Sequence, residues 1–451
     1  MRPRFLPFLA ALAGLPACSS SDDTTADAPS PVNCDPAEDQ KAAARASCEF
    51  GPGALPKETI GCAMRGKRLP FEHVVLFMQE NRSFDHYLQK LPEYGQPDVA
   101  VAPAGAMNPA PDGTPLPFVH TDQYCFDDTN HEWDGSHESF NGGKNDGFAK
   151  ANARASDPTG ARAMAYYDSK DLPFYYQLAD TFTISDSYFC SVMGPTWPNR
   201  MYYFAATSFG NTDNVPVGGE NDTIFDRLNE AGVTWKEYRT NLATSAMFVT
   251  DLLENVDHLV DHSEFAKDVQ NGTLPQVSWV DPLFSAGGAM ESSEHPPGVM
   301  QVGQKWMYDQ LKVLMQSAYW EKTAIFITYD EHGGLYDHVP PPKACAPDDI
   351  APKKGAELGG FDQLGFRVPT YSVSAYTKAH HVSHEVNDHT SLLRFVETLF
   401  DLPALTKRDA NASAMLDFFD FENPPFLEPP QLDEPPIDQV KLEACKLKYP
   451  K

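Results

Sequence analysis

Positive charge is scarce in this sequence of 451 residues: 35 Lys and Arg stand against 63 Asp and Glu, which gives a formal net charge of −28. A surface of that sign repels phosphate backbones, and no basic patch interleaved with aromatic residues is present, so we predict no nucleic-acid partner. Internal repeats and coiled-coil heptads are also absent, which excludes repeat architectures and long coiled coils. Nothing in the sequence predicts a protein partner.

No apolar run near the N-terminus is long enough to cross a bilayer. The run from Phe5 to Ala17 has about 13 residues, whereas a spanning helix needs about 20. Arg2 and Arg4 precede this run, which predicts an export signal, and because they are not adjacent it is not a twin-arginine signal. The run ends in LPAC, which resembles the lipobox of bacterial lipoproteins. That resemblance implies acylation of Cys18 and a lipid anchor in the periplasm or at the cell surface, with cleavage and secretion as the alternative.

Seven cysteines remain once Cys18 is set aside. Export would place them in an oxidising compartment, where disulfides persist. Cys190 lies in an aromatic run that is typical of a buried core, so we expect it to stay unpaired. The other six can form three disulfides in fifteen ways, which the sequence leaves open: Cys34, Cys48, Cys62, Cys125, Cys345 and Cys445.

Apolar, β-rich runs alternate with helical patterns, which predicts an α/β protein with a mainly parallel central sheet. Strands are expected at Phe71–Met78 and Thr323–Tyr329, and weaker ones at Val277–Val280 and Val368–Val373. The stretch from Tyr176 to Ser185 is typical of a helix that ends and leads into a strand. Helices are expected at Thr223–Ala231, closed by Gly232, and at Thr390–Phe400, capped by Asp388 or Thr390.

The two clearest strands are followed by oxygen-bearing side chains. Glu80 and Asn81 follow the first strand, and Asp330 and Glu331 follow the second. Ligands of open α/β sheets bind beyond the carboxyl ends of the strands, so these four residues are expected to converge. Adjacent buried carboxylates are unfavourable unless they are paired or bind a cation. The alternative is an ordinary polar loop with a glycine turn after one strand and a helix cap after the other.

Thr196 lies in the segment GPTWPNR, where Pro198 suits the first turn of a helix. The free N–H groups and the dipole of a helix N-terminus favour a bound phosphate beside this threonine. A simple helix cap is the alternative for Thr196. Arg200, one turn later, either clamps a phosphate oxygen or forms a surface ion pair.

Several histidines lie on loops rich in glycine and proline. A histidine can protonate a leaving alkoxide near neutral pH, although any single one is more often structural. The histidines in question are His131, His137, His295, His332, His338 and His389.

Seven motifs occur in an order that resembles the bacterial phosphoesterase family, which includes phosphatidylcholine-type phospholipases C and periplasmic acid phosphatases. The match runs from about Leu69 to Leu402, through HVVLFMQENRSFDHYL, GGKNDGF, DSYFCSVMGPTWPNR, SEHPP, YDEHGGLYDHVPPP, GFRVP and DHTSLLRFVE. The resemblance implies a three-layer α/β/α, alkaline-phosphatase-like fold. Together with the N-terminal pattern, it divides the chain into four segments: a lipoprotein-type signal peptide at 1–17, a tether and cysteine-containing segment at 18–66, a phosphoesterase catalytic domain at 67–420 and a tail at 421–451. The tail is rich in proline and acidic residues and has little periodicity, so we expect it to wrap the surface, pinned by Cys445.

The resemblance assigns roles to the candidate residues. Thr196 would be both nucleophile and metal ligand, with Arg200, His131 and His295 completing the catalytic group. The other metal ligands would be Glu80, Asn81, Asp330 and Glu331, and the residues placed less firmly around the substrate would be His137, His332, His338 and His389. All-oxygen ligands favour one hard cation, Ca²⁺, Mg²⁺ or Mn²⁺, without excluding Zn²⁺.

These assignments predict an exported hydrolase that cleaves phosphate esters in the manner of phospholipase C, through a phosphothreonine intermediate. The substrate would be a phosphate-ester small molecule or a phospholipid, and the acidic surface favours a zwitterionic or neutral headgroup. An acid phosphatase is the main alternative, since no long C-terminal extension follows the catalytic region. A non-catalytic surface lipoprotein is a third reading. A sulfatase is set aside because oxidation of a threonine would give a ketone rather than an aldehyde.

Overall fold

A mixed sheet forms the centre of the part of the chain that the computed structural model describes, residues 33–35, 37, 39–219, 221–284 and 288–450. The predicted signal peptide and Cys18 lie outside these residues. Within them, the sheet has eight strands in the order β12-β6-β11-β10-β1-β9-β7-β8. The bounds are β1 His73–Gln79, β6 Thr183–Ser185, β7 Trp235–Arg239, β8 Leu259–Asp261, β9 Val277–Val280, β10 Thr323–Tyr329, β11 Tyr371–Val373 and β12 His381–Ser383.

The two central strands are apolar because they are covered on both faces. β10 is buried throughout, and in β1 only His73 is partly exposed. The two strands are parallel, and their last residues, Gln79 and Tyr329, are partners in the register. β11 runs antiparallel to both of its neighbours, whereas the other pairings in the sheet are parallel. The predicted mainly parallel sheet is therefore confirmed.

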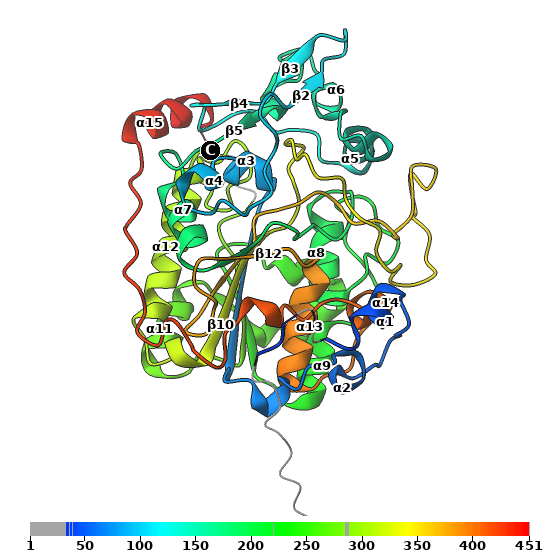
Figure 1. The fold of residues 1–451 in the computed structure, drawn as a ribbon, viewed down its shortest axis with the longest axis vertical. Coiled ribbons are helices and arrows are strands. Elements are labelled where there is room, and N and C mark those ends of the chain that lie inside the picture. The colour runs from blue at the N-terminus through cyan, green and yellow to red at the C-terminus, as the bar shows by residue number, and fades with distance from the viewer. Residues whose placement is uncertain (1–32, 36, 38, 220, 285–287, 451) are drawn as a thin grey trace, which may run out of the picture. The chain divides into compact units, whose positions relative to one another are not determined.

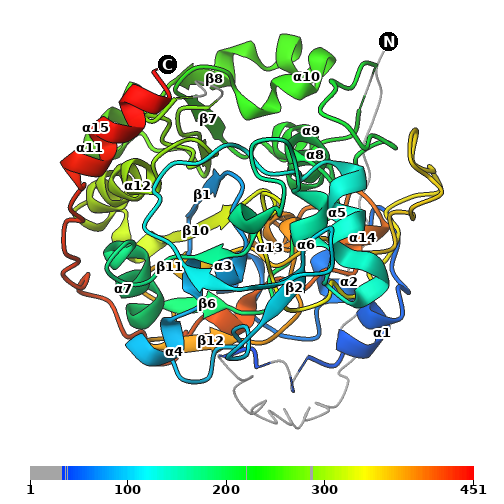
Figure 2. The same cartoon turned by 90° about the horizontal axis from the view of Figure 1, so that it is seen from above.

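Helices cover both faces of this sheet, which gives three layers (Figures 1 and 2). Helices α7, α11 and α12 lie on one side, and α8, α9 and α13 lie on the other. Their bounds are α7 Pro173–Thr181, α8 Thr196–Ala205, α9 Ile224–Ala231, α11 Ser263–Asn271, α12 Met300–Met315 and α13 His389–Phe400. None of the described helices combines the length and apolar character needed to cross a bilayer.

Shorter elements cluster above the carboxyl ends of the central strands in Figure 1. They are α3 Phe84–Leu88, α4 Leu91–Tyr94, α5 Trp133–Phe140, α6 Phe148–Ala151, β2 Met107–Pro109, β3 Pro115–Pro117, β4 Val119–His120 and β5 Ala165–Tyr166. The remaining helices are α1 Ala42–Ala46, α2 Pro56–Thr59, α10 Val249–Glu254, α14 Lys407–Ala410 and α15 Gln439–Lys448.

The helices predicted from their end signals occur where expected. α9 is preceded by Thr223 in a capping box and followed by Gly232 in the left-handed conformation. Asp388 caps α13 through a hydrogen bond from the Thr390 N–H. Two predictions differ in detail. β11 begins only at Tyr371, because Pro369 lacks the N–H that a strand interior needs, and the tail contains α15, which its weak periodicity did not predict.

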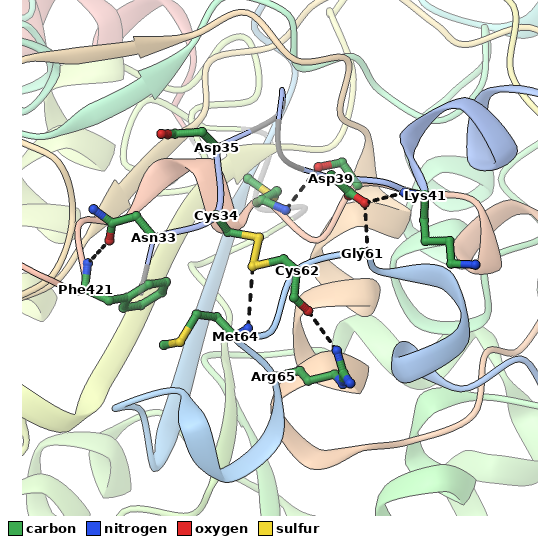
Figure 3. The surroundings of a disulfide bond; sticks show 12 residues. Asn33, Cys34, Asp35, Asp39, Lys41, Gly61, Cys62, Met64, Arg65 and Phe421 are labelled. Atoms are coloured by element: carbon green, nitrogen blue, oxygen red, sulfur yellow. Dashed lines mark hydrogen bonds between the residues drawn. A yellow bond between two sulfur atoms is a disulfide. The ribbon is translucent and has the colours of Figure 1, made fainter. Parts of the chain in front are cut away.

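The described residues contain three disulfides, and Cys190 is free and buried, as predicted. The pairs are Cys34–Cys62, Cys48–Cys345 and Cys125–Cys445. Figure 3 shows the first pair, beside which the Arg65 guanidinium donates to the Cys62 carbonyl and the Gly61 N–H donates to Asp39. The third pair joins α15 to a loop near residue 125 and so confirms that the tail is pinned by Cys445. Disulfides of this kind are typical of exported proteins.

Candidate functional site

The polar ends of β1 and β10 meet at one edge of the sheet. The Asp330 N–H donates to the Gln79 carbonyl at 3.1 Å, and the Asn81 N–H donates to Asp330 Oδ1 at 3.2 Å. Gly333 has a φ of +66°, and a Cβ there would collide with the Asn81 carbonyl, so this close approach of the two chains requires glycine. The expected convergence of the two strand ends is confirmed.

Three buried oxygens at this edge lack a hydrogen-bond partner among the described residues: Gln79 Oε1, Asn81 Oδ1 and Glu331 Oε1. Burial raises the pKa of Glu331 well above its ordinary range, although His131 opposes the shift. Burial also raises the pKa of Glu80 to about 7, with Arg200 lowering it and Asp330 raising it further. Unpartnered amide and carboxylate oxygens together with buried carboxylates fit a hard divalent cation, which would satisfy both.

Thr196 is the first residue of α8, and Pro195 occupies the capping position before it. The threonine is 8% exposed and lies at the N-terminal end of the helix, where unpaired backbone N–H groups gather. Asn199 holds the preceding loop in place, because its side-chain amide donates to the Gly194 carbonyl at 2.9 Å. The loop before Thr196 and the helix that begins with it therefore both hold the threonine in place.

Arg200 extends from the same helix towards the strand ends. Its Nε donates to Asp330 Oδ2 at 3.3 Å, and its Nη2 lies 3.6 Å from Glu80 Oε1. Nη2 also donates to the Met78 and Gln79 carbonyls, at 3.3 and 3.2 Å. In this structure the guanidinium binds the carboxylates and the end of β1, so its role as a phosphate clamp stays a prediction.

A cavity of about 310 Å³ opens beside the threonine. It is lined by Glu80, Asp128, His131, Glu132, Thr196, Trp197, Asn214, Glu291, His295 and Pro296. The sequence had singled out four of these residues, namely Glu80, His131, Thr196 and His295. It missed the other acidic members, Asp128, Glu132 and Glu291, although Asp128 lies three residues before His131 and an acid so close to a candidate histidine was a usable signal.

His131 and His295 face each other across this cavity, with their rings 5.8 Å apart. His131 Nδ1 donates to the Thr129 carbonyl at 2.8 Å, so its Nε2 accepts from the Asn81 amide at 3.2 Å. Asn81 Oδ1 is thereby turned away from this histidine, which agrees with its lack of a hydrogen-bond partner.

His295 has a different environment. Its Nδ1 donates to the Pro296 carbonyl at 2.6 Å, and its Nε2 lies 3.8 Å from Asp128 Oδ2. Burial disfavours the charged imidazole, but the nearby acids Asp128, Glu80 and Glu291 and the hydrogen bond to the Pro296 carbonyl together outweigh this effect and raise its pKa. Ligand atoms of Asp128, His131 and His295 all lie within 4.8 Å of one another, so this group too could hold a cation.

The comparison with protein families agrees with this geometry. A model described as the phosphoesterase family matches residues 71–403. The chain belongs to the phosphoesterase family. The predicted class of enzyme, a hydrolase of ester bonds, is confirmed by this membership.

Similar curated proteins carry related names. Phospholipase C B of Mycobacterium tuberculosis is 36% identical over 423 residues, which cover 80% of each chain. Non-specific phospholipase C1 of Arabidopsis thaliana is 33% identical over 389 residues, which cover 79% of this chain and 72% of its own.

Solved structures with a detectable likeness are more distant. A protein in the alkaline phosphatase superfamily from Vibrio parahaemolyticus has a TM-score of 0.32 at 11% identity, and the match covers 71% of this chain and 78% of the other. A lipoteichoic acid synthase from Listeria monocytogenes has a TM-score of 0.38 at 9% identity over 82% of each chain.

The four remaining histidines of this phosphoesterase do not line the cavity of Thr196. His389 Nε2 donates to the backbone carbonyl of Asp330 at 2.7 Å, and so holds the main chain at Asp330 in place. His332 is buried against Phe366, and burial lowers its pKa well below the ordinary range. Their assignment to the substrate stays a prediction.

His137 and His338 lie in other surroundings. His137 packs on Trp133 with ring centroids 4.4 Å apart. His338 Nδ1 lies 2.7 Å from Asp85 Oδ2, beside the buried ion pair of Asp85 with Arg367. Neither Trp133 nor Asp85 lines the cavity of Thr196, and the assignment of both histidines to the substrate likewise stays a prediction.

Glu294, which the sequence did not single out, anchors the loop of His295. Its buried carboxylate accepts hydrogen bonds from the hydroxyls of Tyr87, Tyr175 and Tyr329 and from the Gln79 amide. Burial raises its pKa despite these bonds. Because Tyr329 ends β10 and Gln79 ends β1, this one carboxylate joins the histidine loop to both strand ends.

Proposed function

We propose that this phosphoesterase hydrolyses phosphate diesters in the manner of phospholipase C, through a phosphothreonine on Thr196. The observation that carries the proposal is the cavity that brings Thr196, Glu80, His131 and His295 to one place at the end of the sheet. The names of the similar proteins, which are phospholipases C, support a diester substrate.

Glu80, Asn81, Asp330 and Glu331 would hold one divalent cation together with the threonine hydroxyl. When bound, the cation would lower the pKa of the hydroxyl and withdraw charge from the phosphate. The unpartnered Asn81 Oδ1 and Glu331 Oε1 support this ligand set. Ca²⁺, Mg²⁺, Mn²⁺ and Zn²⁺ are the candidates.

The protein's own groups would carry the bond changes. Thr196 Oγ, which has already lost its proton to solvent, forms a bond to phosphorus as the alkoxide, and the bond from phosphorus to the leaving alcohol breaks. His295 gives its Nε2 proton to that alcohol, since the Nε2 of His131 already accepts from Asn81. Water then attacks the phosphothreonine and gives a proton to His295, and the bond between Thr196 and phosphorus breaks.

The proposal includes export by the N-terminal signal and a lipid anchor on Cys18. The three disulfides support export. Processing that is sensitive to globomycin would support the lipidated cysteine, and unaltered processing would contradict it.

Thr196→Ala tests the nucleophile. We expect the variant to melt at the wild-type temperature but to lose hydrolysis of p-nitrophenylphosphorylcholine, whereas Thr196→Ser keeps measurable turnover because it retains a hydroxyl. Activity of Thr196→Ala within about tenfold of wild type, a barrier change of only about 1.4 kcal/mol, would contradict the assignment.

A comparison of two substrates, one a diester and one a monoester, distinguishes a diesterase from a monoesterase. Purified protein is assayed on p-nitrophenylphosphorylcholine and on p-nitrophenyl phosphate, from pH 5 to 8, with EDTA and after each metal is added back. Preference for the choline diester supports the proposal. Preference for the monoester at acid pH would show an acid phosphatase, and no turnover of either would show a binding protein.

A further inference from the structure

Exposed apolar side chains collect around the opening of the Thr196 cavity. Val215 follows Asn214 and Met290 precedes Glu291, and both of those polar neighbours line the cavity. Leu242, which is 56% exposed, lines a smaller adjoining cavity together with Thr196 and Arg200. Three separate segments of the chain thus bring an aliphatic or thioether side chain to the same opening.

The short helix α10 extends this surface. Val249 and Leu253 are 43% and 74% exposed, and their spacing of four residues suits one helical face. Val256, which is 60% exposed, follows shortly after the helix ends. The helix begins beside the first of the three segments, because the Val249 N–H donates to the Val217 carbonyl at 3.2 Å. In Figure 2, α10 lies near α8 and α9. We call the whole surface the apolar rim: Val215, Leu242, Val249, Leu253, Val256 and Met290.

We propose that the apolar rim docks on the surface of a phospholipid bilayer with zwitterionic headgroups. The inference rests on the proposed function, since a phospholipase C must bring a membrane-bound ester to its nucleophile. Isolated exposed apolar residues are ordinary, but exposed apolar side chains gathered near a catalytic opening indicate an interaction surface. Side chains of this type gain free energy when they enter the boundary between headgroups and acyl chains.

The charges of the rim select the kind of membrane. The segments 213–217, 242–257 and 288–291 contain five acidic residues and no Lys or Arg. The nearby Lys354 is paired with Asp213. Anionic membranes are bound through clustered basic residues, so this rim would be repelled by them. A zwitterionic surface does not repel the acidic residues, so burial of the apolar side chains can drive binding.

The test measures binding to vesicles without turnover. The full chain carries Thr196→Ala, to prevent hydrolysis, and Cys18→Ser, to prevent lipid attachment. Its partition onto phosphatidylcholine vesicles is followed by sedimentation, alone and with Val215→Ser, Leu253→Ser and Met290→Ser combined. We expect the combined change to lower the partition coefficient at least about tenfold. Phosphatidylglycerol vesicles are expected to bind the unchanged rim more weakly, most clearly at low salt.

A matched control separates the rim from exposed apolar residues in general. Leu427 is 46% exposed, against 45% for Met290, and it follows Phe426, whose carbonyl accepts from Trp320 just before β10 begins. It therefore lies towards the opposite edge of the sheet. Leu427→Ser should leave partition unchanged, while Met290→Ser alone should lower it. Equal effects of the two changes, or none from the combined variant, would overturn the proposal.

Other outcomes identify other occupants. If the protein is a dimer in gel filtration and the combined variant is a monomer, while vesicle binding is unchanged, then the rim is an interface between two copies and the proposal is wrong. The proposed function is judged separately, by turnover of soluble p-nitrophenylphosphorylcholine with Thr196 restored. We expect the combined variant to keep that turnover, so loss of vesicle binding alone is distinguished from loss of the chemistry.

Discussion

Glu80 allows a test of the cation site that does not depend on turnover. The change is Glu80→Gln, compared with wild type in protein freed of metal by EDTA. Burial raises the pKa of Glu80 from an ordinary value of 4.5 to about 7 in the folded chain. The folded protein then binds this proton more tightly than the unfolded protein does, so the metal-free protein loses stability as pH rises from 4.5 through 7.

The magnitude follows from that difference. At 1.36 kcal/mol for each pKa unit, a change from 4.5 to about 7 corresponds to about 3 kcal/mol above pH 7. Glutamine cannot ionise, so it resembles the protonated acid at every pH. In EDTA the variant should therefore match wild type near pH 4.5 and exceed it by up to about 3 kcal/mol at pH 8.

The assay is urea unfolding at pH 5 and pH 8, with EDTA and with an added divalent cation. The cation should reverse the order at pH 8, because it stabilises the wild type, which keeps the ligand, more than the variant. A variant less stable than wild type at pH 8 in EDTA would refute the reasoning. That result would mean that the ion pair with Arg200 outweighs the effect of burial.

Two further predictions concern groups beside the cavity. His295→Gln should lower kcat by about 10²-fold or more on a phospholipid, whose alkoxide needs a proton, but much less on p-nitrophenylphosphorylcholine, whose leaving group does not. The matched change His131→Gln, which removes the imidazole acceptor of the Asn81 amide, should lower the rates on both substrates alike. If His295→Gln also lowered both rates alike, His295 would not be the acid. Cys125→Ser frees α15 and should cost about 2–5 kcal/mol in urea unfolding. Because Cys125 lies close to Asp128 in sequence, KM should rise as well, and an unchanged KM would show that the disulfide does not position the cavity.

Some of this site could be predicted because local patterns encode it. An apolar run followed by oxygen-bearing residues predicts a strand with a ligand site beyond its carboxyl end. The two central strands show this pattern, which leads to Glu80 and Asp330. A proline in the first turn, Pro198, similarly predicts the start of α8 near Thr196. Each of these inferences needs only neighbours within about one turn or one strand.

Other features depend on contacts between distant segments, which no local pattern reveals. The bonds that join Glu294 to Tyr87, Tyr175 and Tyr329 span 35 to 207 residues of sequence. α15 buries only Leu442 and Cys445, so its apolar pattern is too weak to predict a helix without the disulfide that holds it. Asp128 is close to His131 in sequence, but its contact with His295, whose Nε2 lies 3.8 Å from Asp128 Oδ2, joins segments far apart in sequence.

Charge balance explains why one buried acidic cluster should bind a cation while another need not. At the strand ends, Glu80 and Asp330 face the guanidinium of Arg200, and Glu331 lies 3.9 Å from His131 Nε2. Three acids there meet one permanent positive charge and one imidazole, so one acid is left in excess. A divalent cation removes this excess, and the unpartnered Glu331 Oε1 is available to it.

The second cluster has a different composition. Asp85 and Asp337 both bind the buried Arg367, at 2.9 Å each, and His338 lies 2.7 Å from Asp85. Two negative charges there meet one permanent positive charge and an imidazole that can supply the other. Its carboxylates are also saturated with donors from the backbone, including the His338 N–H. Although the ligand atoms of Asp85, Asp337 and His338 lie within 4.8 Å of one another, we expect a cation to enter at the strand ends and not here.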